Sequence, residues 1–222
     1  MDNQENQLLI TLQQKRRKSV IFWTKMVFYS SFFLFLCDGF IIFTLLYKQN
    51  SNLDELFWSV WFWTCILLWL LFYIISLLIK AVVFIRWLYQ SYKNLLLNEI
   101  TLNYKPSMAI WWSIIPIINI IYPVLLMKEL VQKLYQYLNM DFQWIKVNIY
   151  RWWWFLLWSW VLFKQSFNFP EDTFNNVLIW WIFDLFWYLL LILSTILLLK
   201  IFNNLDAVED KFLEKIKTDK SL

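Results

Sequence analysis

The sequence predicts an all-α, polytopic membrane protein with four transmembrane helices, a proline-broken re-entrant or interfacial segment, and amphipathic cytoplasmic helices. Of its 222 residues, 61% are hydrophobic and only 16% are charged, a balance that is atypical of soluble domains. The apolar residues gather in runs long enough to cross a hydrocarbon core of about 30 Å. We therefore expect a cytoplasmic N-terminal segment at 1–19, a transmembrane domain at 20–199, and a cytoplasmic amphipathic tail at 200–222.

The first two predicted spans form a helical hairpin. The first span follows a basic cluster at 15–18 and is interrupted only by Lys25 and Asp38. It is too long for a signal peptide and lacks a small-residue cleavage site, so we expect it to be retained. The two spans and the polar turn between them cover Val20–Tyr47, Lys48–Glu55 and Leu56–Ile79.

The second helix is predicted to continue beyond the membrane, because the chain from Lys80 to Leu95 contains no glycine or proline. Basic residues on this extension and just after it are candidates to bind anionic lipid head groups. The alternative is that they set only the orientation of the chain. These candidates are Lys80, Arg86, Lys93 and Lys105.

The uncharged stretch from Ser107 to Met127 is long enough to span a bilayer, but prolines interrupt it. A break at membrane depth needs protein or water to satisfy the freed backbone groups. The stretch is either a discontinuous helix that binds an ion or head group, or a kinked interfacial hairpin in which Asn119 satisfies a carbonyl freed by Pro116. The candidate residues of this broken-helix site are Pro106, Trp111, Trp112, Pro116, Asn119, Pro123 and Glu129.

Lysine and arginine positions decide the number of spans. If the central stretch does not cross the membrane, every basic residue except Lys48 and Lys164 falls on the cytoplasmic side. If it crosses, the basic residues after it and the basic tail become external. The positive-inside rule prefers the first arrangement, with four spans and both termini in the cytoplasm.

After the central stretch, leucines that recur every four residues predict an amphipathic helix over Val124–Leu138 with Pro123 at its start. The third span is predicted over Arg151–Phe169 and the fourth over Val177–Leu199. The tail that follows has apolar residues at helical spacing between mixed charges. It is expected either to dock beneath the bundle or to bind a partner.

Two carboxylates lie inside predicted spans. Asp38 and Asp184 fall at a similar depth, roughly 10 to 14 Å below the outer surface at 1.5 Å per residue. Lys164 lies somewhat shallower on the third span, where it either snorkels outward or pairs with one of the two acids. Ionisable residues at such depth commonly face a bundle interior or a cavity. They form either a proton- or cation-responsive site or a buried ion-paired cluster that fixes the helix register.

Enzymatic chemistry is not expected. The chain has no histidine and none of the common catalytic or phosphate-binding motifs, and its two cysteines, Cys37 and Cys65, suit buried reduced thiols. We predict no metal site, no cofactor and no nucleic-acid binding, since the net charge of +4 reports orientation. The predicted partners are membrane lipids, a second copy of the chain, or another protein held through the C-terminal tail.

The segment from Ile85 to Trp160 carries a distinctive set of tryptophans, prolines and polar residues. They are Trp87, Asn94, Pro106, Trp111, Trp112, Pro116, Asn119, Pro123, Met127, Glu129, Trp152 and Trp153. With these residues the segment resembles the bacterial membrane family known as domain of unknown function 4328. One position departs from that pattern, because Gln90 stands where the family has an arginine. The resemblance implies a helical domain of the bacterial inner membrane and carries no assigned activity. We therefore expect an inner-membrane protein that binds or transports a small solute, ion or lipid, or else a non-catalytic subunit or scaffold.

Overall fold

The computed structural model describes residues 3–47, 60–108, 110, 118–166 and 174–219. These residues contain helices and no strand, which confirms the all-α prediction for this part of the chain. Three helices contain segments long and apolar enough to cross a membrane, over Thr11–Phe43, Thr64–Leu97 and Leu178–Ile216. The helices are α1 (Asn3–Tyr47), α3 (Val60–Leu97), α5 (Ile118–Tyr137), α6 (Gln143–Ser166) and α7 (Phe174–Asp219).

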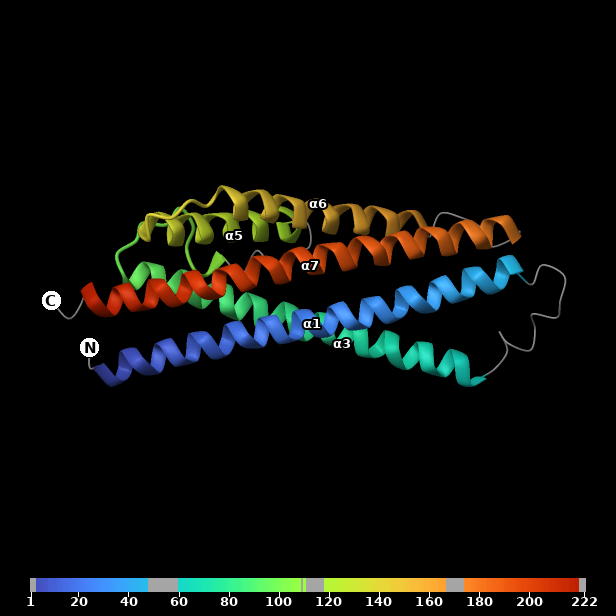
Figure 1. Cartoon of the computed structure of the whole chain (residues 1–222), viewed down its shortest axis with the longest axis horizontal. Helices are drawn as coiled ribbons and strands as arrows, with labels where there is room; N and C mark the ends of the chain where they lie inside the picture. The colour runs from blue at the N-terminus through green and yellow to red at the C-terminus, as the bar shows by residue number, and fades with distance from the viewer. Residues whose placement is uncertain (1–2, 48–59, 109, 111–117, 167–173, 220–222) are drawn as a thin grey trace.

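Four of the helices lie side by side in the order α3, α1, α7 and α6 (Figure 1). The shorter α5 covers only one half of this row, where it contacts α6, α7 and α3. Both ends of the described chain lie at the end of the molecule that α5 covers. The structure therefore has a half thickened by α5 and a half that is an open row of helices.

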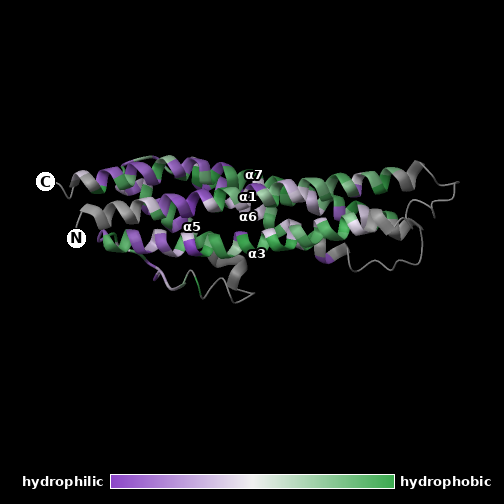
Figure 2. Cartoon of the chain, turned by 90° about the horizontal axis from the view of Figure 1, so that it is seen from below, coloured by the Kyte–Doolittle hydropathy of each residue, from purple (hydrophilic) through white to green (hydrophobic). Residues whose placement is uncertain are grey.

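The two halves differ in polarity. Hydrophilic residues concentrate in the half that holds α5 and the termini, and hydrophobic residues dominate the other half (Figure 2). The main core lies in the polar half. The apolar half has a smaller core, and large apolar side chains cover its outer surface, as expected where helices meet lipid. The fully buried residues of the main core include Trp87, Leu126, Met127, Leu130 and Phe202.

The C-terminal tail continues the last predicted span without a break. One helix, α7, runs from Phe174 to Asp219, because no glycine or proline interrupts this stretch. Three apolar residues of the tail are buried against the rest of the chain: Leu205, Val208 and Phe212. The tail therefore docks on its own bundle and exposes only its polar side.

Helix α6 begins eight residues before the start predicted at Arg151. The carboxylate of Asp141 accepts a 3.0 Å hydrogen bond from the backbone N–H of Gln143 and so caps this end. Ile145 and Ile149 then bury their side chains in the main core. The polar residues of this first part of α6 obscured the helix in the sequence.

Helix α5 also begins earlier than the sequence predicts. It starts at Ile118, so Pro123 lies within its second turn rather than at its first residue. As the sixth residue of α5, Pro123 lies beyond the first four backbone N–H groups, which have no partner inside the helix, so its missing N–H leaves the Asn119 carbonyl without its usual helical donor.

Two helices end in a left-handed residue that is not glycine. Glu99, after α3, has φ 59°, and Asn139, after α5, has φ 53°. At the end of α3, the N–H of Ile100 donates to the carbonyl of Leu95 at 3.1 Å, the pattern of a Schellman motif. The chain has a single glycine, Gly39, so side-chain-bearing residues occupy these strained positions.

Candidate functional site

Helices α1 and α7 share a seam with a strict seven-residue spacing. Four polar residues recur at this spacing on α1, and all of them are buried. Residues seven apart lie on one face of packed helices, so the antiparallel α1 and α7 meet along this face in four layers. We call the eight residues the heptad seam. From the polar half outward, its layers are Arg17 with Glu209, Thr24 with Phe202, Ser31 with Thr195, and Asp38 with Tyr188.

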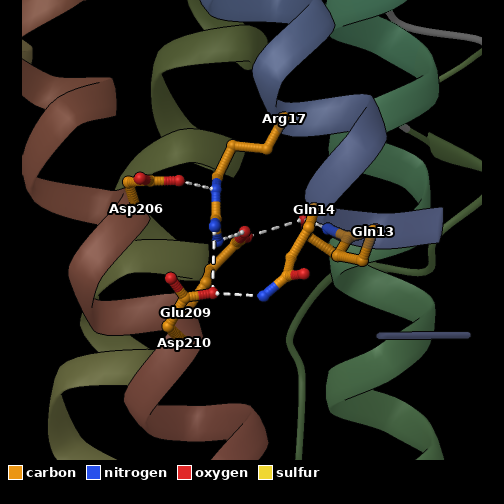
Figure 3. Close-up of polar contacts among 7 residues, drawn as sticks. Gln13, Gln14, Arg17, Asp206, Glu209 and Asp210 are labelled. Carbon is orange, nitrogen blue, oxygen red and sulfur yellow. Dashed lines mark hydrogen bonds and ion pairs between the residues drawn. The ribbon is translucent and has the colours of Figure 1, made fainter. Parts of the chain in front are cut away.

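The first layer is a buried ion-pair network (Figure 3). The Arg17 guanidinium is only 1% exposed and contacts three carboxylates on α7. Its Nη1 lies 3.0 Å from Glu209 Oε2, its Nη2 lies 3.0 Å from Asp210 Oδ1, and its Nε pairs with Asp206. Gln14 adds a 3.0 Å hydrogen bond to Asp210. These contacts fasten the start of α1 to the tail of α7.

Helix α3 joins the same network through two hydrogen bonds. Gln13 Nε2 donates to Ser91 Oγ at 2.7 Å, and Ser91 Oγ donates to Glu209 Oε1 at 3.1 Å. The adjacent cavity, which Asn94 also lines, has a volume of about 10 Å³. This volume is too small for a ligand larger than a single water. Because the Glu209 carboxylate is paired and the cavity has no room for a ligand, this end of the seam is suited to holding three helices together.

The fourth layer contains the two predicted intramembrane acids. The carboxyl groups of Asp38 on α1 and Asp184 on α7 lie within hydrogen-bonding reach of each other. A hydrogen bond between two carboxyl groups requires that one of them carry a proton. Tyr188 lies beside both acids, and Asp38 is 6% exposed. Asp38 Oδ2 is buried and has no hydrogen-bond partner in the described part of the chain.

Lys164, the third residue predicted for this cluster, lies apart from the acids. It occupies the last turn of α6, and its side chain is exposed. Within the described ranges, every ion pair involves Arg17, so none joins Lys164 to Asp38 or Asp184. The structure thus brings together two carboxyl groups without the lysine that a static ion-paired cluster would need.

Of the predicted broken-helix residues, the structure gives Glu129 a clear role. Its carboxylate is 6% exposed and accepts hydrogen bonds from the Tyr92 hydroxyl at 3.0 Å and from the backbone N–H of Asn103. Glu129 therefore ties the loop after α3 to α5, a structural contact. Pro106 is half-buried in that loop. Trp111, Trp112 and Pro116, and the side chains of Asn119 and Pro123, lie outside the described residues.

The predicted lipid-binding residues do not form one cluster. Arg86 and Lys93 are exposed on α3, and Lys105 is exposed in the loop that follows. Lys80 and Lys93 are thirteen residues apart in sequence, which is about 20 Å along α3. Of the four residues, only Lys80 lies at the boundary between the polar and apolar halves.

This boundary carries lysines from several helices at one level. The contact between Arg17 and Glu209 fixes the register of α1 and α7. Lys25 follows Arg17 by eight residues and Lys200 precedes Glu209 by nine, so each lies about 12 to 14 Å outward from that contact. The two lysines therefore share one level of the molecule.

The same level continues onto α3 and α6. The hydrogen bond between Gln13 and Ser91 fixes the register of α3, and it places Lys80 beside this level. On α6, the Trp144 ring lies 5.3 Å from the Nζ of Lys200. We call the four lysines at this level the lysine belt: Lys25, Lys80, Lys146 and Lys200.

Sequence reasoning missed the heptad seam, although its signal is present in the sequence. Polar residues at 17, 24, 31 and 38 keep an uninterrupted spacing of seven. Their partners on α7 could be recognised only once the antiparallel register was known. Comparisons of the chain with protein-family models, with curated proteins and with solved structures find no match, so the resemblance to domain of unknown function 4328 stays a prediction.

Proposed function

We propose that this chain is a four-span integral membrane protein whose paired Asp38 and Asp184 bind a proton or another small monovalent cation inside the bilayer. One observation carries the proposal: two carboxyl groups lie together in the apolar half, and the described residues place no lysine or arginine against them. Ionisable groups in such a setting commonly serve ion or proton pathways. A single negative charge shared by two buried carboxyl groups favours a bound cation.

The lysine belt supports the placement in the membrane. From Lys200 outward to Val177, α7 runs through 23 residues, about 35 Å, and Asp184 is the one charged residue among them. From Lys146 to Lys164, α6 covers about 27 Å and so matches the hydrocarbon thickness of about 30 Å. Helix α6 would therefore be a fourth span beside the three more apolar helices. Its many tryptophans make it less hydrophobic than the others and suit the membrane interface.

The charge distribution supports the orientation. The termini, α5 and most basic residues lie on the polar side of the lysine belt, which the positive-inside rule assigns to the cytoplasm. Helix α5, packed on the bundle, then lies at the cytoplasmic face of a bacterial inner membrane. From the belt, Asp38 is thirteen residues outward, so the acid pair would sit about 20 Å into the bilayer.

Infrared spectroscopy of the purified protein in lipid nanodiscs tests the proposal. We expect a protonated-carboxyl band that responds to pH in the wild-type protein. The double variant Asp38→Asn with Asp184→Asn should lose this band, whereas Lys164→Gln should keep it. A spectrum unchanged in the double variant would show that the pair holds no exchangeable proton. A shift of the band on adding sodium chloride would identify a competing metal cation.

A scaffold role is the second candidate, and the exposed surface of α3 favours it. In the apolar half, α3 packs along α1 and leaves large side chains uncovered, Leu67, Leu68 and Leu78 among them. A partner protein or a second copy of this chain would bury them. If a stoichiometric protein partner co-purifies with this chain in mild detergent, the scaffold role is supported. If the chain purifies alone with bound lipid, a binding or transport role is favoured.

A further inference from the structure

We propose that protons reach the Asp38–Asp184 pair from the cytoplasmic side along the heptad seam, and that Phe202 closes this route. The inference rests on the proposed function of the acid pair and adds the path and its barrier. It follows from a column of buried hydroxyl groups that begins beside the acids and ends at one aromatic layer.

The hydroxyl groups come from all three helices that meet at the seam. Ser31 on α1 and Thr195 on α7 form the layer next to the acids, and both are at least 96% buried. The Tyr73 hydroxyl of α3 lies within hydrogen-bonding reach of Ser31. Tyr188 lies close to both Tyr73 and the acid pair. Three helices thus supply hydroxyl-bearing side chains to this part of the seam.

Tyr73 bridges the distance between layers. Successive layers of the seam are seven residues, or about 10.5 Å, apart, which is too far for a direct hydrogen bond. Long side chains on a helix lean toward its N-terminus. Helices α3 and α7 both begin at the outer end, so Tyr73 leans outward from the level of Ser31 toward the acids, and Tyr188 leans from the level of Asp38 toward Asp184.

Two buried polar atoms along the column have no hydrogen-bond partner in the part of the chain that the structure describes. One is Asp38 Oδ2, at the outer end. The other is the Oγ of Ser76, which is fully buried one helical turn from Tyr73 toward the cytoplasm. Buried polar atoms are rarely left without partners, so these two atoms call for an explanation. Both are available to a transferring proton or to an entering water.

The hydroxyl of each seam residue can still accept a hydrogen bond. Ser31 donates to the Val27 carbonyl at 2.8 Å, and Thr195 donates to the Leu191 carbonyl at 2.7 Å. This leaves the oxygen lone pairs of both side chains available. Such a hydroxyl can act as a relay when its O–H turns from the helix carbonyl toward the next acceptor: its oxygen accepts a proton from one neighbour, and its own proton passes to the next.

An aromatic layer interrupts the column on the cytoplasmic side. Phe202 is fully buried opposite Thr24, and its ring centroid lies 5.0 Å from that of Trp87 in an edge-to-face contact. The Phe84 ring also packs on the Phe202 ring, with the two centroids 6.1 Å apart. Beyond this layer the seam becomes polar again at Arg17. One layer therefore separates the hydroxyl column from the polar half; Phe202 fills it on the α7 side, and on the α1 side the Thr24 hydroxyl donates to the Val20 carbonyl at 2.7 Å.

Few titratable or charged side chains of the neighbouring helices lie close to the acid pair in the described residues. Cys37 on α1 and Tyr188 on α7 lie near it, and Tyr73 on α3 lies near Tyr188. On α6, Lys164 is exposed and lies apart. Between the Phe202 layer and the acid pair, the described residues place no lysine or arginine on the seam. The cations on the cytoplasmic side of this stretch are Arg17, which is paired with three carboxylates, and the lysine belt.

The test is a rapid pH jump on the protein in nanodiscs, with the carboxyl infrared band as the readout. Tyr73→Phe should slow the response of the band at least about tenfold, because it removes one proton-transfer group. Tyr29→Phe is the matched control: Tyr29 lies at nearly the same level on α1 but is 59% exposed, so its loss should leave the rate unchanged. An equal rate in wild type and Tyr73→Phe would overturn the route.

The barrier is tested with Phe202→Ala, and with Phe202→Leu in case the larger truncation does not fold. Either variant should speed the response, and adding Tyr73→Phe should cancel the gain. Leu198→Ala, a buried truncation one turn away and off the seam, should not change the rate. If Phe202 variants respond no faster than Leu198→Ala, Phe202 is not the barrier. A wild-type protein without any pH-sensitive carboxyl band would instead overturn the proposed function itself.

Discussion

Removing the Arg17 side chain should destabilise the protein more than any other single change to a charged residue on α1. Arg17→Met leaves the Glu209 carboxylate, which is 4% exposed, without its cation. Breaking a buried pair in this way costs about 3 to 5 kcal/mol in the free energy of unfolding. By contrast, Asp206 and Asp210 are 40% and 42% exposed, so Asp206→Asn or Asp210→Asn should cost no more than about 1 kcal/mol each.

Equilibrium unfolding in mixed micelles, followed by tryptophan fluorescence, measures these differences. Arg16→Met is the matched control, since Arg16 is the adjacent arginine, lies partly exposed and is outside the network; we expect a change within about 0.5 kcal/mol. Combining Arg17→Met with Glu209→Leu should recover much of the loss, because no unpaired charge is then buried. If Arg17→Met were no more harmful than Arg16→Met, the ion-pair network would not hold α1 to α7.

Outcomes for four further variants are predicted in the same unfolding assay. Asp38→Asn should change the free energy of unfolding by less than about 1 kcal/mol, because an amide can keep the hydrogen bond to Asp184. Lys164→Gln should have no measurable effect. A loss of stability in both variants would instead support the predicted ion-paired cluster. Tyr92→Phe should cost about 1.5 to 3 kcal/mol, since it removes a hydrogen bond to the buried Glu129 carboxylate, and a loss below about 0.5 kcal/mol would contradict that role. Glu99→Gly should stabilise the chain by about 0.5 to 1 kcal/mol by relieving the left-handed backbone at φ 59°, so a destabilised variant would refute the strain.

The sequence predicted helices well where composition alone decides them. The apolar run that contains Asp38 and the run that contains Asp184 both appear as helices, and the equal depth of these residues anticipated their contact. The extension of the second span to Leu95 was also expected and is present in α3. Periodicity and hydropathy report such features because they depend on local sequence.

Helix ends and long-range partners were harder to predict. The start of α6 depends on a cap at Asp141 and on burial of Ile145, which polar neighbours in the sequence concealed. The contact of Arg17 with Glu209 joins residues 192 positions apart, so no local pattern reveals it. The lysine predicted to neutralise the acid pair was placed by depth alone, and depth does not determine which face of α6 it occupies.

Cysteine accessibility tests the central claim that the apolar half crosses the membrane four times and leaves the α5 half in the cytoplasm. In a variant with Cys37 and Cys65 replaced by serine, single cysteines are introduced at Gln136, on the exposed side of α5, and at Ser51 and Thr173, in the two predicted outer turns. Intact cells are treated with a membrane-impermeant maleimide. Labelling at Ser51 and Thr173, with labelling at Gln136 only after the cells are opened, is the result that four spans predict. Labelling of Gln136 in intact cells would contradict the four-span topology and place α5 outside.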